Sequence, residues 1–408
     1  MAGALDGLRV LDLSRILAGP LVGQMLGDLG AEVIKVERPG RGDDARAMGP
    51  PFLADGNGEE PLMAGFYLSC NRNKKSVAVD FARPEGQNLV RRMARECDVL
   101  IENFKVGTLA RFGLDYERLR AEAPGLIYCS ITGFGQTGPY ANKPGYDGIF
   151  QAMSGLMSVS GHPDGALGAG PMKVGISIVD ILTAHNAVIA ILAALRHRDA
   201  KGGGQALDIS LLDCGVAALS HFAQNYLVSG EVPERRGNGG YGGIPSQAFQ
   251  CADRAVFVVV GNNAQYSRFC QAIGRPDLID DERFRTGPLR IMNRRVMLPI
   301  LDQLFARRSA AEWVELLDAA EVPVSLVNDV AAAFRDPQVE HRGMIVERAM
   351  ADGTPLKMVA NPLRFSVTPI EQYAVPPSLG QDSETLFADW LGLDAATLSA
   401  LRRNGTIA

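Results

Sequence analysis

The sequence lacks the features that would connect it to nucleic acid, a membrane surface or a metal. Its 408 residues carry a formal net charge of -5, which offers no excess of positive charge to a nucleic acid or an anionic lipid surface. The six cysteines form no C-x-x-C pair and the five histidines show no ligand spacing, so neither a disulfide framework nor a metal site is predicted.

Long apolar runs and targeting segments are missing as well. No stretch of 18 or more apolar residues runs without a charge, and a strand pattern begins within about ten residues of the first Met, where a signal peptide would need the room. We therefore expect a cytoplasmic protein with reduced thiols, and neither a nucleic acid nor a membrane as its partner.

Two common catalytic motifs are absent. The sequence has no G-x-x-x-x-G-K-[ST] loop, and Ser154 lacks the preceding glycine of a G-x-S-x-G elbow. A literal G-x-G-x-x-G does occur at Gly237, Gly239 and Gly242. Because it follows a polar linker and leads to Pro245 rather than into a helix, dinucleotide binding is not predicted.

The sequence does contain an alternation of short apolar strands and helices as far as residue 132. The strand patterns are LRVLDLS (8–14), AEVIKVE (31–37), SVAVDF (76–81), DVLIENF (98–104) and LIYCSIT (126–132). Strands separated by helices predict a doubly wound, Rossmann-like parallel sheet, whose ligands bind beyond the carboxyl ends of the strands. Arg38 follows the second strand beside Gly and Pro, and this position favours a phosphate contact over a solvated surface charge.

Composition divides the chain into three parts. The stretch 231–245 is rich in Gly, Pro and charge, as in a linker or loop. We predict a large α/β domain at 1–225, a small α/β domain at 226–328 with this glycine-rich loop at its start, and a C-terminal segment at 329–408.

The segment 173–198 predicts a long buried helix with Asp180 at its start, because apolar residues recur at helical spacing after that aspartate. A carboxylate in this position has two interpretations. It caps the helix, or it acts as a nucleophile toward an activated acyl group, which the glycines between 155 and 175 would allow to approach.

Seven segments, in order and spread over the first half of the chain, resemble the family III CoA-transferases of the CaiB/BaiF type. They are LDLSRILAGP, LGDLGAEVIKVERPGRGDD, NRNKKSVAVDF, DVLIENFKVGTLARFGL, YCSITGFGQTGPY, GYDGIFQAMSGLM and KVGISIVD. The resemblance implies ping-pong transfer with Asp180 as the nucleophile, in which coenzyme A is a substrate and part of a covalent aspartyl-CoA thioester. No permanently bound cofactor is implied.

The resemblance also assigns the binding residues, position by position. It implies CoA contacts at Leu17, Ala18, Arg38, Val79, Asp80, Phe81, Ala82, Asn103, Phe104, Lys105, Arg111, Thr132, Gly133, Phe134 and Gly135. A glycine loop that closes over the intermediate corresponds to Gly239, Gly240, Gly242 and Gly243. For a second carboxylate of the substrate, the candidate cations are Arg15, Arg72 and Lys173.

The fold implied by the resemblance is an interlocked homodimer, with a Rossmann-like large domain built from both chain ends and a small α/β domain. Further segments, among them ALSHFAQNYL and VVVGNNAQ, are most similar to enzymes that move CoA from succinyl-CoA to dicarboxylates such as glutarate. Leu17 stands where the oxalate enzymes often carry glutamine, which disfavours the alternative of a formyl- or acetyl-CoA:oxalate transferase.

Two other classes stay open at this point. In an α-methylacyl-CoA racemase a histidine base would stand at Tyr146, and a phenol with a pKa near ~10 is a poor base at neutral pH. Asp147 beside it is expected to cap a helix. A CoA-binding protein without catalysis is the third hypothesis, and the presence of Asp180 argues against it.

Overall fold

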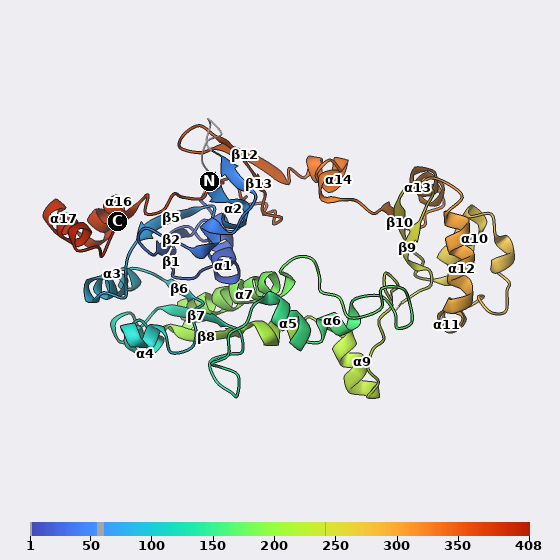
Figure 1. The fold of residues 1–408 in the computed structure, drawn as a ribbon, viewed down its shortest axis with the longest axis horizontal. Coiled ribbons are helices and arrows are strands. Elements are labelled where there is room, and N and C mark those ends of the chain that lie inside the picture. Colours follow the sequence, from blue (N-terminus) through green and yellow to red (C-terminus); the bar gives the residue numbers. More distant parts are fainter. Residues whose placement is uncertain (1, 55–60, 241) are drawn as a thin grey trace. The chain divides into compact units, whose positions relative to one another are not determined.

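The computed structural model describes residues 2–54, 61–240 and 242–408, and Figure 1 shows the elements. Contacts divide the chain into two compact units. The first contains Met1–Leu156, Lys173–Glu231 and Glu340–Ala408, and the second contains Met157–Met172 and Val232–Val339. These limits differ from the predicted domains: the second unit ends at Val339 rather than 328, and it includes 157–172, a stretch that we assigned to the large domain.

The first unit is organised around a six-stranded sheet with the order β5-β2-β1-β6-β7-β8, in which every pairing is parallel. This confirms the predicted α/β fold around a parallel sheet. Its strands are β1 (Arg9–Asp12), β2 (Glu32–Glu37), β5 (Lys74–Ala78), β6 (Val99–Glu102), β7 (Ile127–Thr132) and β8 (Gln205–Ser210).

A core cluster covers each face of this sheet. Successive side chains of a strand point to opposite faces, so each strand contributes to both clusters. Leu11, Ile34 and Leu100 are register partners and belong to one core cluster. Their neighbours Val10 and Val33 belong to the cluster on the other face. The helices between the strands are α1 (Ala18–Asp28), α2 (Gly65–Leu68), α3 (Pro84–Arg95), α4 (Tyr116–Glu122), α5 (Asp147–Met153), α6 (Leu156–Val159) and α7 (Ile178–Lys201).

Helix α7 is the long buried helix that the sequence predicted. Ala184, Ala187 and Ile191 are fully buried in the cluster that also contains residues of α1 and β6. Among the described residues, α7 is the single helix long and apolar enough to cross a membrane by length and composition, a test that core helices also pass. Its buried face packs against α1, α5 and α8 (Leu211–Ala217), whereas Ile189 on the same helix is exposed.

The C-terminal segment returns to the first unit and covers the edge strand β5. It contributes the hairpin β12 (Ile345–Ala349) and β13 (Pro355–Val359), then α16 (Ser383–Leu391) and α17 (Ala395–Arg403). Ser76 N donates to Asp382 Oδ2 over 2.8 Å, and Ala78 N donates to Ser383 Oγ over 3.0 Å. These bonds satisfy N–H groups at the edge of the sheet, so both ends of the chain build this unit.

The second unit contains a three-stranded antiparallel sheet with the order β11-β10-β9. Its strands are β9 (Ser246–Gln250), β10 (Ala255–Val259) and β11 (Val324–Leu326), and its helices are α10 (Asn263–Ala272), α11 (Gly287–Met292), α12 (Arg294–Phe305), α13 (Ala310–Ala319) and α14 (Val330–Phe334). Phe305 stacks on Phe249 with ring centroids 4.5 Å apart and lies 4.7 Å from Trp313. Asn293 separates α11 from α12.

Shorter elements complete the chain. They are the hairpin β3 (Phe52–Ala54) and β4 (Pro61–Ala64), α9 (His221–Ser229), α15 (Pro337–His341), and the single turns η1 (Asp44–Ala47), η2 (Leu109–Phe112) and η3 (Pro276–Leu278). All six cysteines are buried free thiols.

The burial of Ile191 predicts a graded loss of stability. Ile191→Ala removes three buried carbon atoms from the α7 core, and we expect it to lower the free energy of unfolding by about 2–5 kcal/mol. Ile191→Val serves as the control and is expected to cost about 0.5–1.5 kcal/mol. Urea denaturation measures both, and two variants equal to wild type would show that this face of α7 is not packed.

Candidate functional site

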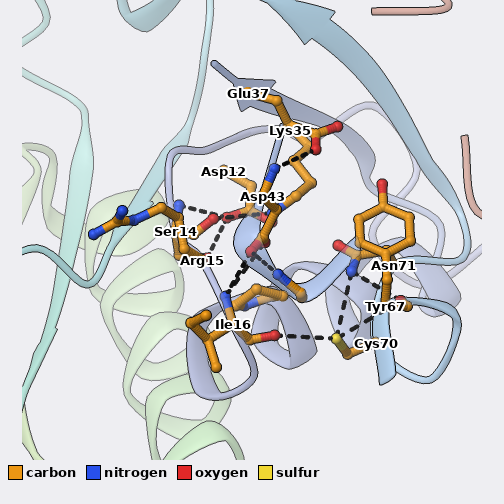
Figure 2. Close-up of polar contacts among 12 residues, drawn as sticks. Asp12, Ser14, Arg15, Ile16, Lys35, Glu37, Asp43, Tyr67, Cys70 and Asn71 are labelled. Atoms are coloured by element: carbon orange, nitrogen blue, oxygen red, sulfur yellow. Dashed lines mark hydrogen bonds and ion pairs between the residues drawn. The ribbon is translucent and has the colours of Figure 1, made fainter. Parts of the chain in front are cut away.

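The loop after β1 holds Ile16 in a left-handed conformation, with φ 73°, that β-branched residues rarely adopt. Figure 2 shows the contacts that hold it. Ile16 N donates to Asp43 Oδ1 over 3.1 Å, and Ile16 O accepts from Cys70 Sγ over 3.5 Å. The Asn103 side-chain amide fixes the backbone of Arg15, the residue before Ile16. Asn103 Oδ1 accepts from Arg15 N over 2.8 Å, and Asn103 Nδ2 donates to Arg15 O over 2.7 Å. Such strain persists where the surroundings determine the conformation, and it is common at functional sites.

Two buried ion pairs, Lys35–Asp43 and Lys74–Asp12, support this loop. The Lys35 ammonium lies 2.8 Å from Asp43 Oδ2 and donates to Ser14 O over 2.9 Å. The Lys74 ammonium lies 2.8 Å from Asp12 Oδ2, and both lysine side chains are fully buried. Burial alone would raise the pKa of Asp43, but the charge and hydrogen bond of Lys35, together with the N–H donors of Ala45 and Ile16, lower that pKa. Because breaking a buried pair leaves an uncompensated charge, the two pairs fix the loop firmly.

Beside the loop, at the carboxyl ends of β1, β2, β5 and β6, lies a cavity of about 310 Å³. Its lining includes seven residues that the sequence singled out: Arg15, Arg38, Val79, Asp80, Phe81, Ala82 and Phe104. The Arg15 guanidinium lies over the Phe104 ring, 4.8 Å from its centroid. Sequence reasoning missed Arg41, which also lines the cavity, although it follows Arg38 in the same ERPGRGDD turn. Cations and aromatic rings together suit a ligand that carries phosphates and a planar base.

Two of the predicted CoA-binding loops share one buried carboxyl group, Glu102 at the end of β6. Its Oε2 accepts from Phe104 N over 2.7 Å, and its Oε1 pairs with the Ser130 hydroxyl of β7. Gln136 Nε2 donates to Ser130 Oγ over 2.6 Å. Burial raises the pKa of Glu102 to about 7. The loops that follow β6 and β7 are thereby held in a fixed relation.

The other residues of these loops are also in place. Gly135 N donates to Thr132 Oγ1 over 2.9 Å, and the Phe134 ring packs edge-on against Phe150 of α5, with centroids 5.2 Å apart. A Cβ at Gly133 would lie 2.6 Å from the Phe150 ring, so the close approach requires glycine. At the start of α1, Leu17 is the N-cap and Ala18 is the first helical residue, while Lys105 and Arg111 are exposed after β6.

Asp180 does not cap its own helix. It is the third residue of α7, and Ser177 at the N-cap makes no side-chain cap bond. Asp147 of α5 supplies the cap instead, since its Oδ1 accepts from Val179 N over 2.8 Å and from Asp180 N over 3.3 Å. The capping interpretation of Asp180 was therefore wrong, whereas the expectation that Asp147 caps a helix is confirmed, for α7 rather than for its own helix.

The Asp180 carboxylate has no hydrogen-bond or ion-pair partner in the part of the chain that the structure describes, and its residue is partly buried. Burial, and secondly the charge of Asp147, raise the pKa of Asp180 to about 7. A carboxylate without donors and with a raised pKa is a candidate nucleophile or base.

The candidates for a second carboxylate differ in their surroundings. The Arg72 guanidinium is committed to Asp28, with Nε donating to Oδ1 over 2.9 Å, and to Val359 O over 2.8 Å. This contradicts its assignment to a substrate, because these bonds use Arg72 to join α1 to the C-terminal hairpin. Arg15 is exposed at the cavity, and Lys173 is exposed before α7.

The predicted glycine loop lies in the second unit. Gly240 N donates to Ser246 O over 2.8 Å, and a Cβ at Gly243 would lie 2.0 Å from Val260 O. Gly239 and Gly242 belong to the same loop, and Tyr241 between them lies outside the described residues. Across the described residues, no group of three or more His, Cys, Asp or Glu side chains could hold a metal ion.

Comparison with known proteins gives three concordant results. Residues 5–383 match the model of the family described as "CoA-transferase family III". A "Succinate--glutarate CoA-transferase" of Agrobacterium fabrum is 44% identical over 385 residues, which cover 94% of this chain and 95% of the relative. The "Succinyl-CoA:glutarate CoA-transferase" of Homo sapiens is 38% identical over 403 residues, covering 99% of this chain and 90% of the relative.

A solved structure agrees with this result. The crystal structure of a CAIB/BAIF family protein from Brucella suis has a TM-score of 0.85 and 42% sequence identity, and the match covers 96% of this chain and all of that one. The similarity in sequence and the similarity in fold therefore extend over nearly the same residues.

The raised pKa of Asp180 predicts a stability effect that depends on pH. In the unfolded chain this carboxyl loses its proton near pH 3.8, but in the folded chain only near pH 7, so its ionisation favours unfolding as the pH rises between those values. Asp180→Asn removes this penalty. We expect the variant to be more stable than wild type at pH 8 by about 1–2 kcal/mol, after discounting for partial exposure, with a smaller difference at pH 5. Thermal denaturation at both pH values measures this, and a variant less stable at pH 8 would contradict the raised pKa.

Proposed function

Because the chain belongs to CoA-transferase family III, we propose that it moves CoA from succinyl-CoA to a second dicarboxylate such as glutarate. The protein is a CoA-transferase, and the two relatives described above carry this substrate pair in their names. The observation that carries the mechanism is the Asp180 carboxylate, which is partly buried and has no partner among the described residues.

Asp180 acts as a nucleophile in a ping-pong reaction. Its carboxylate attacks the thioester carbonyl, the C–S bond breaks, and a mixed anhydride forms while CoA leaves as a thiolate. The thiolate then attacks the aspartyl carbonyl, which releases the first acid and leaves an aspartyl-CoA thioester. The acceptor carboxylate attacks this thioester, which breaks the C–S bond, releases CoA as a thiolate and forms a second mixed anhydride between Asp180 and the acceptor. The thiolate then attacks the acceptor's carbonyl carbon in this anhydride, which forms the new acyl-CoA and releases the Asp180 carboxylate. Asp180 is regenerated, and no proton is consumed.

CoA binds in the cavity beside the β1–α1 loop. Arg38 and Arg41 supply positive charge for its phosphates, and Phe104 offers a ring to the adenine. The remaining predicted contacts lie on loops at the same end of the sheet, so a single extended ligand accounts for the set. The positive end of the α1 dipole, at Leu17 and Ala18, supports negative charge at the reacting carbonyl.

The second carboxylate binds a cation, for which Arg15 and Lys173 remain after Arg72 is set aside. For Gly239, Gly240, Gly242 and Gly243 we propose the role that the family resemblance implies, a loop that covers the intermediate, because exclusion of water protects an anhydride from hydrolysis. We place the enzyme in the cytoplasm.

The enzyme works as an interlocked homodimer. Large apolar side chains are exposed on α7 and α9, namely Ile189 at 64%, Leu227 at 73% and Val228 at 79% exposure, which is the kind of surface that a second copy covers. Light scattering that gives the mass of a single chain would contradict this assembly.

Trapping of the intermediate tests the proposal. Trypsin is expected to release residues 174–196, in which Asp180 is the only acidic side chain, so that an adduct on this peptide identifies the nucleophile. After incubation with succinyl-CoA, we expect mass spectrometry to show CoA on this peptide, or its hydroxamate after hydroxylamine treatment.

Two variants complete this experiment. Asp180→Ala should lose the adduct and at least about 10³-fold in kcat while keeping its fold, since the oxygens of the neighbouring carboxylate, Asp147, are engaged by Val179 N and Gln151 Nε2. Asp199→Ala, at the other end of the same helix, should keep both. A wild-type enzyme that turns over without an adduct on 174–196 would exclude Asp180 as the nucleophile.

A panel of glutarate, succinate and oxalate as acceptors decides between the dicarboxylate and the oxalate activities.

The cavity assignment makes a separate prediction for Arg38. Arg38→Ala should raise KM for the CoA thioester about tenfold and change kcat little, because a phosphate contact far from the carbonyl stabilises ground and transition states equally. Arg120→Ala, an exposed arginine on α4 outside the cavity, is the control and should leave KM unchanged. If KM of the Arg38 variant equals that of wild type, Arg38 does not bind CoA.

A further inference from the structure

The start of α7 is capped from a different helix. Figure 1 shows α5 beside α7, and the two helices are in contact. Asp147 is the first residue of α5, and its Oδ1 lies 2.8 Å from Val179 N and 3.3 Å from Asp180 N. The first N–H groups of a helix have no partners within it, so a carboxylate in this position is well placed to accept from them.

A buried glutamine fixes Asp147 in this role. Gln151, one turn later on α5, is fully buried, and its Nε2 donates to Asp147 Oδ2 over 2.6 Å. The same side chain accepts from Val174 N over 2.8 Å and donates to Ile176 O over 3.2 Å. Gln151 therefore ties the segment that precedes α7 to α5 and holds Asp147 Oδ2, which leaves Oδ1 to accept from Val179 N and Asp180 N.

This arrangement has an electrostatic consequence for Asp180. A carboxylate in the first turn of a helix is ordinarily stabilised by free N–H groups and by the helix dipole, and its pKa falls. Here the N–H groups of Val179 and Asp180 donate to Asp147, which also brings a negative charge. Burial and that charge together move the pKa of Asp180 upward.

No other charge nearby opposes this effect. The elements packed against α7 are α1, α5, α8, β7 and β8. Apart from Asp147, their titratable side chains are Asp28, Tyr128, Cys129, Asp208, Asp213 and Cys214, and none of them contributes to the shift of Asp180. The first lysine or arginine on α7 or on these elements is Arg196, sixteen residues after Asp180 along α7.

We propose that Asp147 is a positioning residue for the transfer reaction: it accepts from the N–H groups at the start of α7 and places its negative charge beside Asp180, so that the Asp180 carboxylate stays without donors and reactive. The proposal rests on the role of Asp180 as the nucleophile. A more basic carboxylate attacks the thioester faster, because nucleophilic reactivity rises with basicity. A carboxylate held by two N–H groups would have to give up those bonds on attack.

Asp147→Asn tests this, since asparagine keeps a carbonyl oxygen for Val179 N and removes the charge. The measurement is the pH dependence of kcat/KM, which reports ionisation in the free enzyme. We expect the acid limb, near pH 7 in wild type, to move down by about one pH unit in Asp147→Asn, and the plateau at high pH to fall by about tenfold.

Gln151→Ala is the matched control. It breaks the bonds that hold Asp147 but changes no charge, so a purely structural role predicts the same profile for both variants. We expect Gln151→Ala to lower activity equally at every pH and to leave the acid limb in place. Circular dichroism shows whether each variant is folded. The rate of adduct formation on peptide 174–196, measured as a function of pH, reports on Asp180 directly.

The outcomes separate the two claims. Absence of an adduct on peptide 174–196 in wild type overturns Asp180 as the nucleophile. An adduct in wild type together with an unmoved acid limb in Asp147→Asn, or an equal shift in Gln151→Ala, overturns the role of Asp147 alone. A limb that moves down only in Asp147→Asn supports it.

Discussion

The pairing of Lys35 with Asp43 is the interaction on which the arrangement of the first unit depends. Lys35 lies on β2 and Asp43 on the loop that follows it, and together they hold Ser14 O and Ile16 N of the β1–α1 loop. That loop determines where α1 begins, and α7 packs against α1. A buried ion pair contributes little net stability compared with apolar packing, but it specifies one geometry, because each partner is costly to leave alone.

Two buried carboxyl groups, of Asp43 and Glu102, and the partly buried carboxyl of Asp180 show how surroundings give one chemical group different roles. Asp43 faces an ammonium, and its pKa is lowered. Glu102 has a hydroxyl and an N–H but no cation, and burial raises its pKa to about 7. Asp180 has neither, and it faces a second carboxylate. The first two hold loops in place, whereas the third is available to react, since its oxygens are engaged by no other described group.

The sequence predicted those parts of the protein that follow from local pattern. Alternating apolar strands predicted the parallel sheet, and the rule that ligands bind beyond strand ends predicted Arg38 at the cavity. Which helix Asp147 caps and the pairing of Arg72 with Asp28 could not be predicted, because each contact joins residues more than thirty positions apart. The sequence shows where a helix starts and where an arginine stands. The hydrogen-bond partners of the helix N–H groups and of the guanidinium depend on tertiary packing.

The position of Asp180 resolves a conflict between placing a nucleophile and leaving it reactive. Hydrogen bonds would hold a carboxylate still but would also stabilise its charge and reduce its reactivity. Asp180 is positioned instead by its backbone, on the first turn of a helix whose Ala184, Ala187 and Ile191 are fully buried. Packing of the later turns fixes the first one, and Asp147 satisfies its N–H groups. The stability gained from packing α7 in the core thus offsets the free-energy penalty of desolvating the Asp180 carboxylate, and its side chain can remain without partners among the described residues.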